Sequence, residues 1–415
     1  MRDVLIPFPT LWDQPQLQAC RPDWGSRFCP HLLSPPDAEV HWLFDLEAFV
    51  QAQVAGWRGR AAGVFSSSDY PGAVAAAAIA QALGLAGPGA ASVLRATHKY
   101  RARQAMQSVA PVRHALIDPD AIVAPDIGFP CFVKPVKGTY SMFTRRVEDL
   151  AELRSFLQSA NVQEYRHQFL AIFNRTWRKH TGDAVDGRYF LAEEPLGGAQ
   201  VTVEGMIARG QVTIFGVVDS EFAPDSSSFS RFVYPSRLPP EPQRTLTDTA
   251  TAAVLALGID NTLFNLELFW HPQRGAQVIE FNPRMCGQFA DLYQRVDGKN
   301  SYVAAMELAC GLEPMWPRGQ GKSAIAASVP LRVFEPVEVT AAPTPAQLLE
   351  LAERFSDALI WSEVCPGMKL DELHLEDGAS TRYAVINLGA ATEAELQDST
   401  RAIGAALGFQ FQPLR

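Results

Sequence analysis

The sequence predicts a protein of mixed α/β and α+β class, built from about three domains. The prediction rests on the length of 415 residues, on the hydrophobic content of 47% and on an order of strands and helices that changes along the chain. At roughly 150 residues per domain, the length corresponds to two or three domains. The apolar content excludes a disordered chain, and 29 Gly and 30 Pro scattered throughout exclude a coiled coil.

Residues 1–95 are predicted to form an N-terminal α/β domain. The expected elements are a short apolar strand within residues 1–10, a strand at 60–65 and an alanine-rich helix at 73–83. Gly84 is expected to end this helix. The polar turn Ser-Ser-Ser-Asp at 66–69 precedes it, and we expect this turn to cap the helix, with anion binding as the alternative.

Residues 96–315 are predicted to form the largest domain. Strands are expected at 129–136, 191–195, 201–207, 211–218, 262–270 and 276–282. Helices are expected where apolar residues recur at helical spacing, first with Val147, Leu150, Leu153 and Leu157, and then over 246–257. Arg209 and Gly210 are expected to turn one hairpin, and Gly258 to end the second helix.

Residues 316–415 are predicted to form a small C-terminal α+β domain after a glycine-rich stretch at 317–321. Strands are expected at 324–334, 359–364 and 383–388, and helices at 346–355 and 393–407. The sequence contains no internal repeat.

Charge and apolar patterning restrict the class of partner. The formal net charge of -9 argues against a nucleic acid or an anionic membrane, because both require a basic surface. The most apolar stretch, 73–94, is interrupted by glycine and proline and cannot supply about 20 continuous apolar residues. No export signal is recognised at the start of the sequence, so we expect a cytoplasmic protein.

The six cysteines are widely spread and include no CxxC pair, which favours reduced thiols over a disulfide framework. Cys20, Cys29 and His31 form one loose group of potential metal ligands. Because this group lacks the paired spacing of zinc sites, the sequence favours no metal there.

Two polar pairs stand out in the last predicted hairpin of the middle domain. Strand alternation places Asn265 and Glu267 on one face, and likewise Glu280 and Asn282. If the hairpin is symmetric about the bond between residues 273 and 274, Glu267 lies opposite Glu280, and Asn265 lies opposite Asn282. Facing carboxylates repel each other unless a cation lies between them, and converging oxygen ligands suit Mg²⁺. The alternative is a solvated hairpin face.

Arg284 follows this hairpin directly. Pro283 ends the strand after Asn282, so Arg284 is expected beside the carboxylates. A guanidinium there could hold a phosphoryl or acyl-phosphate oxygen with two donors. The alternative is an arginine that only neutralises the glutamates.

Taken together, these motifs resemble those of the ATP-grasp superfamily. Glu267 followed by Glu280-Phe281-Asn282-Pro283-Arg284 resembles its metal-binding signature. Four further segments match in the expected order: His98-Lys99 with Arg101 and Arg103, the strand 129–135, the hinge Glu193-Glu194-Pro195-Leu196, and the end of a preceding α/β domain at 64–92. The resemblance covers roughly residues 60–315. It implies an ATP-grasp fold between an N-terminal pre-ATP-grasp domain and the small C-terminal domain.

The resemblance also implies a role for each matching residue. Lys99 and Lys134 would contact the phosphates of ATP, with Ser141 in the phosphate loop. Glu193, Glu194 and Leu196 would hold the adenine, and Gln200 would replace the glutamate with which many relatives bind the ribose. Glu267, Glu280 and Asn282 would hold Mg²⁺, expected as two ions with Mn²⁺ as a substitute, and Arg284 would act in catalysis. His98 replaces the usual aspartate of its segment.

The implied activity is an ADP-forming ligase that joins a small-molecule carboxylate to an amine through an acyl phosphate. The layout favours amino acids or similar small acids as substrates, and the family often forms homodimers. Alternatives are another ATP-grasp activity, either bicarbonate activation as in carboxylases or a kinase, and a non-catalytic nucleotide-binding regulator. Residues 219–238 are expected to form a long loop in which Arg231 or Arg237 could bind the substrate carboxylate, although a purely solvated loop is an equal alternative.

Overall fold

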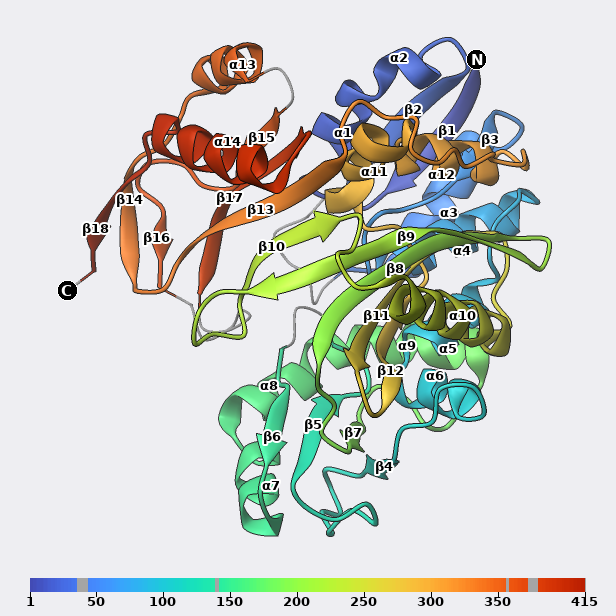
Figure 1. Cartoon of the computed structure of the whole chain (residues 1–415). Coiled ribbons are helices and arrows are strands. Elements are labelled where there is room, and N and C mark those ends of the chain that lie inside the picture. Colours follow the sequence, from blue (N-terminus) through green and yellow to red (C-terminus); the bar gives the residue numbers. More distant parts are fainter. Residues whose placement is uncertain (36–43, 139–141, 356–357, 372–379, 415) are drawn as a thin grey trace.

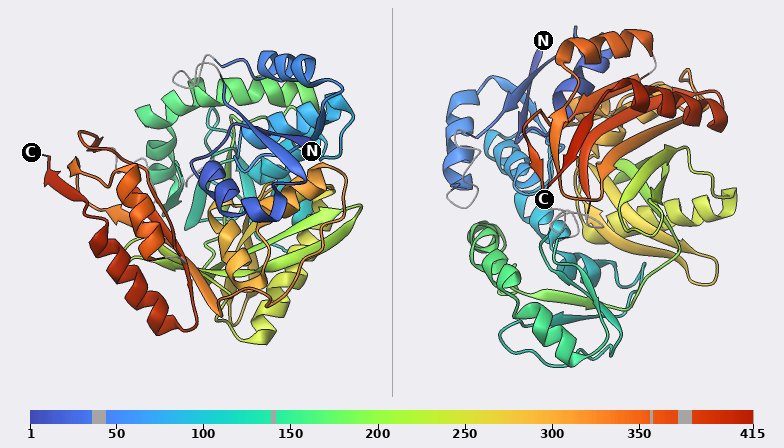
Figure 2. Two further views of the ribbon diagram at one scale, coloured as in Figure 1. Left: turned by 90° about the horizontal axis from the view of Figure 1, so that it is seen from above. Right: turned by 90° about the vertical axis from the view of Figure 1, so that its left-hand side faces the viewer.

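The computed structural model describes residues 1–35, 44–138, 142–355, 358–371 and 380–414. Its strands form four sheets, the largest of which has eight strands and lies at the centre (Figure 1). In the right-hand view of Figure 2, a four-stranded sheet and its helices form a lower lobe, beneath the N-terminal part in blue and the C-terminal part in red. The candidate site lies between the N-terminal part, the lower lobe and the central sheet.

The N-terminal sheet is parallel, with strand order β2-β1-β3. Its strands are β1 (Arg2–Pro7), β2 (Phe28–Leu33) and β3 (Ala61–Val64). The accompanying helices are α1 (Asp13–Ala19), α2 (Arg21–Trp24), α3 (Leu46–Trp57), α4 (Gly72–Leu83) and α5 (Ala90–Thr97). The expected strands β1 and β3 and the expected helix α4 are confirmed, and Gly84 ends α4 with a positive φ of 68°. β2 and the helices α1 to α3 were not predicted.

The serine turn does not cap α4, so that expectation was wrong. The N-cap residue of α4 is Pro71, which makes no side-chain cap. Ser66 donates to the carbonyl of Pro7 at 2.9 Å, and Ser67 donates to the carboxylate of Asp13 at 2.7 Å. These partners come from a segment about 55 residues earlier, so local sequence could not indicate them.

The four-stranded sheet is antiparallel, with strand order β4-β7-β5-β6. Its strands are β4 (His114–Ile117), β5 (Cys131–Pro135), β6 (Arg145–Val147) and β7 (Phe190–Glu193). The helices nearby in the chain are α6 (Lys99–Met106), α7 (Leu150–Leu157), α8 (Ala160–His167) and α9 (Phe169–Thr181). Val147, expected in a helix, ends β6 opposite Cys131, because it fills the same buried cluster as Leu153 and Leu157 of α7.

The central sheet has strand order β12-β11-β8-β9-β10-β13-β17-β15. Its strands are β8 (Ala199–Ala208), β9 (Gln211–Phe222), β10 (Phe229–Tyr234), β11 (Thr262–His271), β12 (Gly275–Asn282), β13 (Ile325–Val333), β15 (Ala358–Ser362) and β17 (Thr381–Ala390). Arg209 and Gly210 both have positive φ, 51° and 75°, in the turn between β8 and β9, as type I′ hairpins require. α10 (Pro240–Leu257) ends at Gly258 and packs its buried Leu246 in the same cluster as Leu266 of β11.

Half of the long loop expected at 219–238 is strand, which corrects that prediction. β9 continues to Phe222, and β10 begins at Phe229. β10 is held between β9 and β13, and β13 lies about 90 residues later in the sequence. One of the two pairing partners of β10 is therefore distant in sequence, and the other, β9, precedes it directly.

The C-terminal strands β13, β17 and β15 continue the central sheet, so the boundary expected at residue 316 stays a prediction. A small sheet, β16-β14-β18, consists of β14 (Val337–Ala341), β16 (Lys369–Leu370) and β18 (Gln410–Pro413). The remaining helices are a 3-10 turn (Gly287–Phe289), α11 (Ala290–Asp297), α12 (Ser301–Ala309), α13 (Pro345–Arg354) and α14 (Glu393–Ala406). In the part of the chain that the structure describes, no helix combines the length and the apolar character that crossing a membrane requires.

Candidate functional site

The hairpin β11–β12 has the predicted pairing at its polar end. Glu267 lies opposite Glu280, and Asn265 lies opposite Asn282. The turn differs from the prediction, because His271 pairs with Gly275 and the hairpin is centred on Gln273. A bulge between Val278 and Glu280 shifts the register by one residue and restores the predicted pairing.

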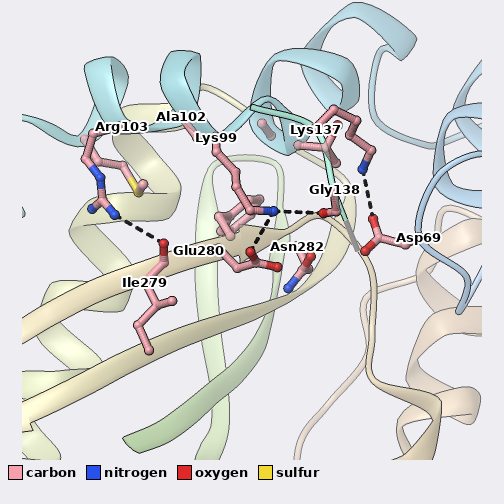
Figure 3. Close-up of a pocket in the computed structure, with 13 residues that line it drawn as sticks. Asp69, Lys99, Ala102, Arg103, Lys137, Gly138, Ile279, Glu280 and Asn282 are labelled. Carbon is pink, nitrogen blue, oxygen red and sulfur yellow. Dashed lines mark hydrogen bonds and ion pairs between the residues drawn. The ribbon is translucent and has the colours of Figure 1, made fainter. Parts of the chain in front are cut away.

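The bulge also supplies a carbonyl to the site. Ile279 has no partner residue across the hairpin, and its carbonyl accepts hydrogen bonds from Arg103 Nη2 at 3.2 Å and from Lys134 Nζ at 3.3 Å. Figure 3 shows Arg103 of α6 reaching this carbonyl. The irregularity therefore ties α6 and β5 to the carboxylate hairpin.

Lys99, at the start of α6, neutralises one of the two carboxylates. Its Nζ lies 2.8 Å from Oε2 of Glu280 and donates to the carbonyl of Gly138 at 2.9 Å (Figure 3). Burial alone would raise the pKa of Glu280, but the charge of Lys99 outweighs it and holds that pKa below its usual value. Burial alone would likewise lower the pKa of Lys99, and Glu280 raises it. Both groups are therefore ionised at neutral pH.

His98, which replaces the usual aspartate of its segment, caps α6. Its Nδ1 accepts from the backbone N–H of Arg101 at 3.4 Å, so it caps α6 and fixes the start of the helix at Lys99. Burial lowers the pKa of His98 to about 4, and the imidazole is neutral at pH 7. Its ring packs on that of Trp177, with the ring centres 4.6 Å apart.

Lys134, Arg103 and Glu193 form a buried charge cluster beside the carboxylate hairpin. Lys134 Nζ lies 2.6 Å from one oxygen of Glu193, and Arg103 Nη2 lies 2.5 Å from the other. All three residues are at most 5% exposed. Burial would raise the pKa of Glu193, but its two cations hold it below the usual value. Burial lowers the pKa of Lys134 in spite of this pairing.

Asp69, which the sequence predicted only as part of a cap, reaches the site from the loop between β3 and α4. Its oxygens lie 3.5 Å from Lys137 Nζ and 3.6 Å from Arg284 Nη2. Burial would raise the pKa of Asp69, and the charges of Lys137 and Arg284 lower it well below its usual range. Burial lowers the pKa of Lys137, which is 2% exposed. The sequence offered one signal for Lys137, its position three residues after Lys134.

A second missed residue, Glu204 of β8, lies behind the hairpin. Its carboxylate accepts from Asn265 Nδ2 at 3.1 Å, from the backbone N–H of Cys286 at 2.7 Å and from the hydroxyl of Tyr293 at 2.9 Å. Asn265 in turn accepts from Asn282 Nδ2 at 3.4 Å, which leaves the amide oxygen of Asn282 as its remaining acceptor. Burial raises the pKa of Glu204 to about 7.

A cavity of about 10 Å³ lies between α6, the segment after β5, and the hairpin (Figure 3). Its charged and amide lining residues are Asp69, Lys99, Arg103, Lys137, Glu280 and Asn282. Such a volume holds about one water molecule, so the lining residues would have to move apart to admit a nucleotide. The donor set nevertheless fits Mg²⁺ and a polyphosphate: two carboxylates and an amide oxygen beside several cations. One buried donor of the cavity lining, Nη1 of Arg103, has no partner among the described residues.

The other predicted site residues are placed less centrally. Gln200 Nε2 lies 3.4 Å from Glu267 Oε2, and Glu194 accepts from the backbone N–H of Arg113 at 2.9 Å. Leu196 is partly buried in the irregular segment after β7. Ser141 lies outside the described residues.

Arg231 and Arg237, predicted as candidates for the substrate carboxylate, are ion-paired within the protein. Arg231 binds Glu221 at 2.5 Å and Glu393 at 2.6 Å. Arg237 binds Asp219 and Glu221. Neither arginine lines the cavity beside the hairpin. A role in substrate binding would require these pairs to open.

A model of the ATP-grasp domain family matches residues 127–291, which include the carboxylate hairpin and Arg284. A search of curated proteins finds no relative by sequence. Among solved structures, the chain is similar to L-amino acid ligase from Bacillus licheniformis, with a TM-score of 0.76 at 16% identity over 100% of this chain and 99% of the other. It is also similar to phosphoribosylglycinamide synthetase from Anaerococcus prevotii (TM-score 0.63, 13% identity, 100% of each chain). A biotin carboxylase from Campylobacter jejuni, solved with β,γ-ATP, has a TM-score of 0.67 at 14% identity over 99% and 92% of the two chains.

Proposed function

The chain contains an ATP-grasp domain, and on that premise we propose that it is an ADP-forming ligase that joins a small carboxylic acid to an amine. Amino acids are the proposed substrates. The L-amino acid ligase named above, which has this fold along its whole length, supports that choice.

The observation that carries the proposal is the pairing of Glu267 with Glu280 across the hairpin, with Lys99 2.8 Å from Glu280. A purely structural hairpin would gain nothing from facing carboxylates at its partly buried end. Divalent cations held by carboxylates neutralise charge on transferring phosphoryl groups. Glu267, Glu280 and Asn282 would hold Mg²⁺, proposed as two ions with Mn²⁺ as a substitute.

The proposed reaction proceeds in two steps. A carboxylate oxygen of the acid attacks the γ-phosphorus of ATP, the bond from that phosphorus to ADP breaks, and an acyl phosphate forms. The amine nitrogen then attacks the acyl carbon, the bond from that carbon to the phosphate oxygen breaks, and phosphate leaves while the nitrogen gives up a proton to solvent, which yields the amide. Cations placed where negative charge develops accelerate both steps. Lys99, Lys137 and Arg284 would provide them.

Each predicted nucleotide contact retains its proposed role. Lys134 would contact the phosphates once its pairing with Glu193 adjusts. Glu193, Glu194 and Leu196 would hold the adenine, and Gln200 the ribose. Asp69 is added as a positioning residue, because it holds Lys137 and Arg284 on either side of one carboxylate.

The proposal is tested by phosphate and ADP release from Mg-ATP, with amino acids supplied singly and in pairs. We expect release only with particular pairs, together with a product whose mass is the sum of the pair less one water. ATP binding without release for any pair would contradict the ligase, and release with bicarbonate or with a hydroxyl acceptor would favour the carboxylase-type or kinase alternatives.

The metal assignment is tested in the same assay with Glu280→Gln. We expect a loss of at least about 100-fold, because changing even a group behind a metal ligand costs about 10- to 100-fold. Glu313→Gln is the matched control, since the Glu313 side chain is 74% exposed, pairs with Arg209 and does not line the cavity beside the hairpin. Equal rates for Glu280→Gln and the wild-type protein would refute the assignment.

A further inference from the structure

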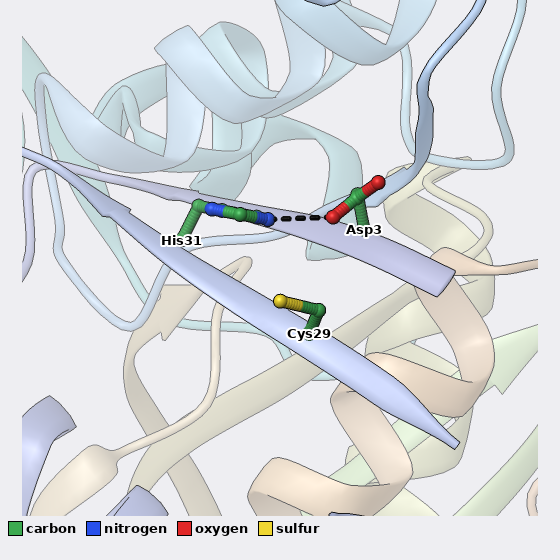
Figure 4. A group of neighbouring side chains, drawn as sticks. All are labelled: Asp3, Cys29 and His31. Atoms are coloured by element: carbon green, nitrogen blue, oxygen red, sulfur yellow. Dashed lines mark hydrogen bonds and ion pairs between the residues drawn. The ribbon is translucent and has the colours of Figure 1, made fainter. Parts of the chain in front are cut away.

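Three potential metal ligands lie together on the N-terminal sheet, away from the carboxylate hairpin. Asp3 of β1 pairs with Cys29 of the neighbouring parallel strand β2, and His31 lies two residues further along β2. Residues two apart on a strand share a face, so the three side chains project on one side of the sheet (Figure 4). Their ligand atoms all lie within 4.8 Å of one another.

Neighbouring residues orient these three side chains but leave them accessible to solvent. His31 Nε2 lies 2.7 Å from Oδ1 of Asp3, and the imidazole packs against Trp57 of α3 with ring centres 4.5 Å apart. The side chains of His31 and Asp3 are 30% and 36% exposed, and Cys29 is partly buried. An ion could therefore enter from solvent to side chains whose directions are already fixed by the sheet and by Trp57.

We propose that Asp3, Cys29 and His31 form a zinc site with water as the fourth ligand. A thiolate, an imidazole and a carboxylate are the three side-chain ligand types of zinc, whereas Mg²⁺ and Ca²⁺ take oxygen ligands. Zinc bonds of about 2.0 to 2.3 Å in a tetrahedron separate ligand atoms by about 3.3 to 3.8 Å. That separation falls between the 2.7 Å of the ion pair and the 4.8 Å limit of the group, so the ligand atoms lie within about 1 Å of the spacing that zinc requires.

The site would differ in chemistry and in consequence from the carboxylate hairpin. β2 is an edge strand that pairs only with β1 among the described strands. An ion bound by Asp3 of β1 and by Cys29 and His31 of β2 would link the two strands. Because the ion would bind only the folded state, it would raise the free energy of unfolding. Zinc is therefore expected to stabilise the N-terminal sheet and to leave the proposed ligase chemistry unchanged.

The structure also explains why sequence spacing argued against a metal here. Cys20, the nearest cysteine in sequence, is fully buried, and its thiol lies 3.8 Å from the carbonyl of Leu17. Burial raises the pKa of Cys20 to about 12, which disfavours the thiolate that binds metals. Asp3 takes its place, 26 positions before Cys29, and only the parallel pairing of β1 with β2 reveals it.

Cobalt replaces zinc as a spectroscopic probe of this proposal. The protein is reduced, freed of reductant and titrated with Co²⁺. Excess Mg²⁺ is present to fill the proposed magnesium site of Glu267, Glu280 and Asn282, which has oxygen ligands only. We expect one ion per chain, a sulfur-to-cobalt charge-transfer band in the near ultraviolet, and loss of the band when Zn²⁺ is added. Cys29→Ala should abolish the band, and Cys365→Ala, which removes an exposed thiol, should retain it.

Two further variants keep the test decisive if Cys29→Ala folds poorly. Asp3→Asn and His31→Gln preserve side-chain size, and each should weaken Co²⁺ binding by about 10-fold or more. Zinc should raise the melting temperature of the wild-type protein more than that of either variant. A wild-type protein without a sulfur-to-cobalt band, or a band that survives in Cys29→Ala, would show that the group is an ion pair beside a free thiol and would overturn the proposal.

Discussion

Replacing Glu204 by Gln should remove a large pH-dependent contribution to stability. The carboxyl is buried, and its pKa is raised from 4.5 to about 7. The folded protein therefore binds this proton more tightly than the unfolded chain does. The resulting stability is fully present below pH 4.5 and is lost as the pH rises through about 7. At about 1.4 kcal/mol per pH unit, the loss amounts to about 3 kcal/mol of the free energy of unfolding.

The neutral Gln side chain imitates the protonated form of Glu204 and does not titrate. Its amide oxygen can accept from Asn265 and from the backbone of Cys286, while its amino group can donate to the hydroxyl of Tyr293. Relative to the wild-type protein, the variant should therefore gain about 3 kcal/mol between pH 4.5 and pH 8.

The variant must be compared with the wild-type protein at each pH, because His98 makes stability rise with pH while Glu204 makes it fall. Burial lowers its pKa from 6.5 to about 4, so His98 contributes stability above pH 6.5 that is lost as the pH falls through about 4. In the wild-type protein the two contributions largely cancel between pH 4.5 and 6.5. The difference between the two proteins isolates Glu204.

The assay is urea unfolding followed by intrinsic fluorescence at intervals between pH 4.5 and 8, with Glu313→Gln as the control for loss of a surface carboxylate. The unfolding free energies of Glu204→Gln and the wild-type protein should diverge as the pH rises, while Glu313→Gln should run parallel to the wild-type protein. Parallel curves for Glu204→Gln would refute the reasoning, because they would mean that Glu204 has an ordinary pKa in the folded protein.

Three further variants test other parts of the structure. Glu193→Gln leaves two buried cations without their carboxylate and should cost about 3 to 5 kcal/mol of unfolding free energy in urea titrations, whereas a cost below about 1 kcal/mol would contradict the buried pairing. Leu266→Ala leaves a cavity at a fully buried position behind the hairpin and should lower the free energy of unfolding by about 2 to 5 kcal/mol. Leu255→Ala, at a position of α10 that is 51% exposed, should lower it far less. Equal losses would contradict the packing of α10 against the hairpin. Asp69→Asn should lower kcat for ADP release about 10-fold or more without raising KM for ATP, because Lys137 and Arg284 lose the carboxylate that positions them. A raised KM with unchanged kcat would instead indicate that Asp69 contacts the nucleotide.

The carboxylate hairpin was predictable because its information is local. Strand alternation and a short turn place Glu267 beside Glu280, and the bulge corrects the one-residue error in the assumed turn. Helices such as α4 and α10 were predicted for the same reason, since apolar spacing and a terminal glycine lie within one segment.

The missed features depend on partners that are distant in sequence. Asp69 belongs to the site because Lys137 and Arg284 come to it from segments about 70 and about 215 residues later. Glu204 reads as an ordinary strand residue until β11 brings Asn265 beside it. Likewise, β10 has a second partner, β13, that lies about 95 residues later in the sequence. Tertiary pairing of this kind decides the outcome where local patterns leave strand and loop equally favourable.

The central claim, that this protein activates a carboxylate as an acyl phosphate, is tested most directly by isotope transfer. The acid of an active pair is supplied with ¹⁸O in both carboxylate oxygens, and the released phosphate is analysed by mass spectrometry. The proposed reaction leaves one acid oxygen in the phosphate when the amine displaces it, so each phosphate should carry one ¹⁸O. Unlabelled phosphate, formed together with the amide product, would contradict the acyl phosphate and with it the proposed mechanism.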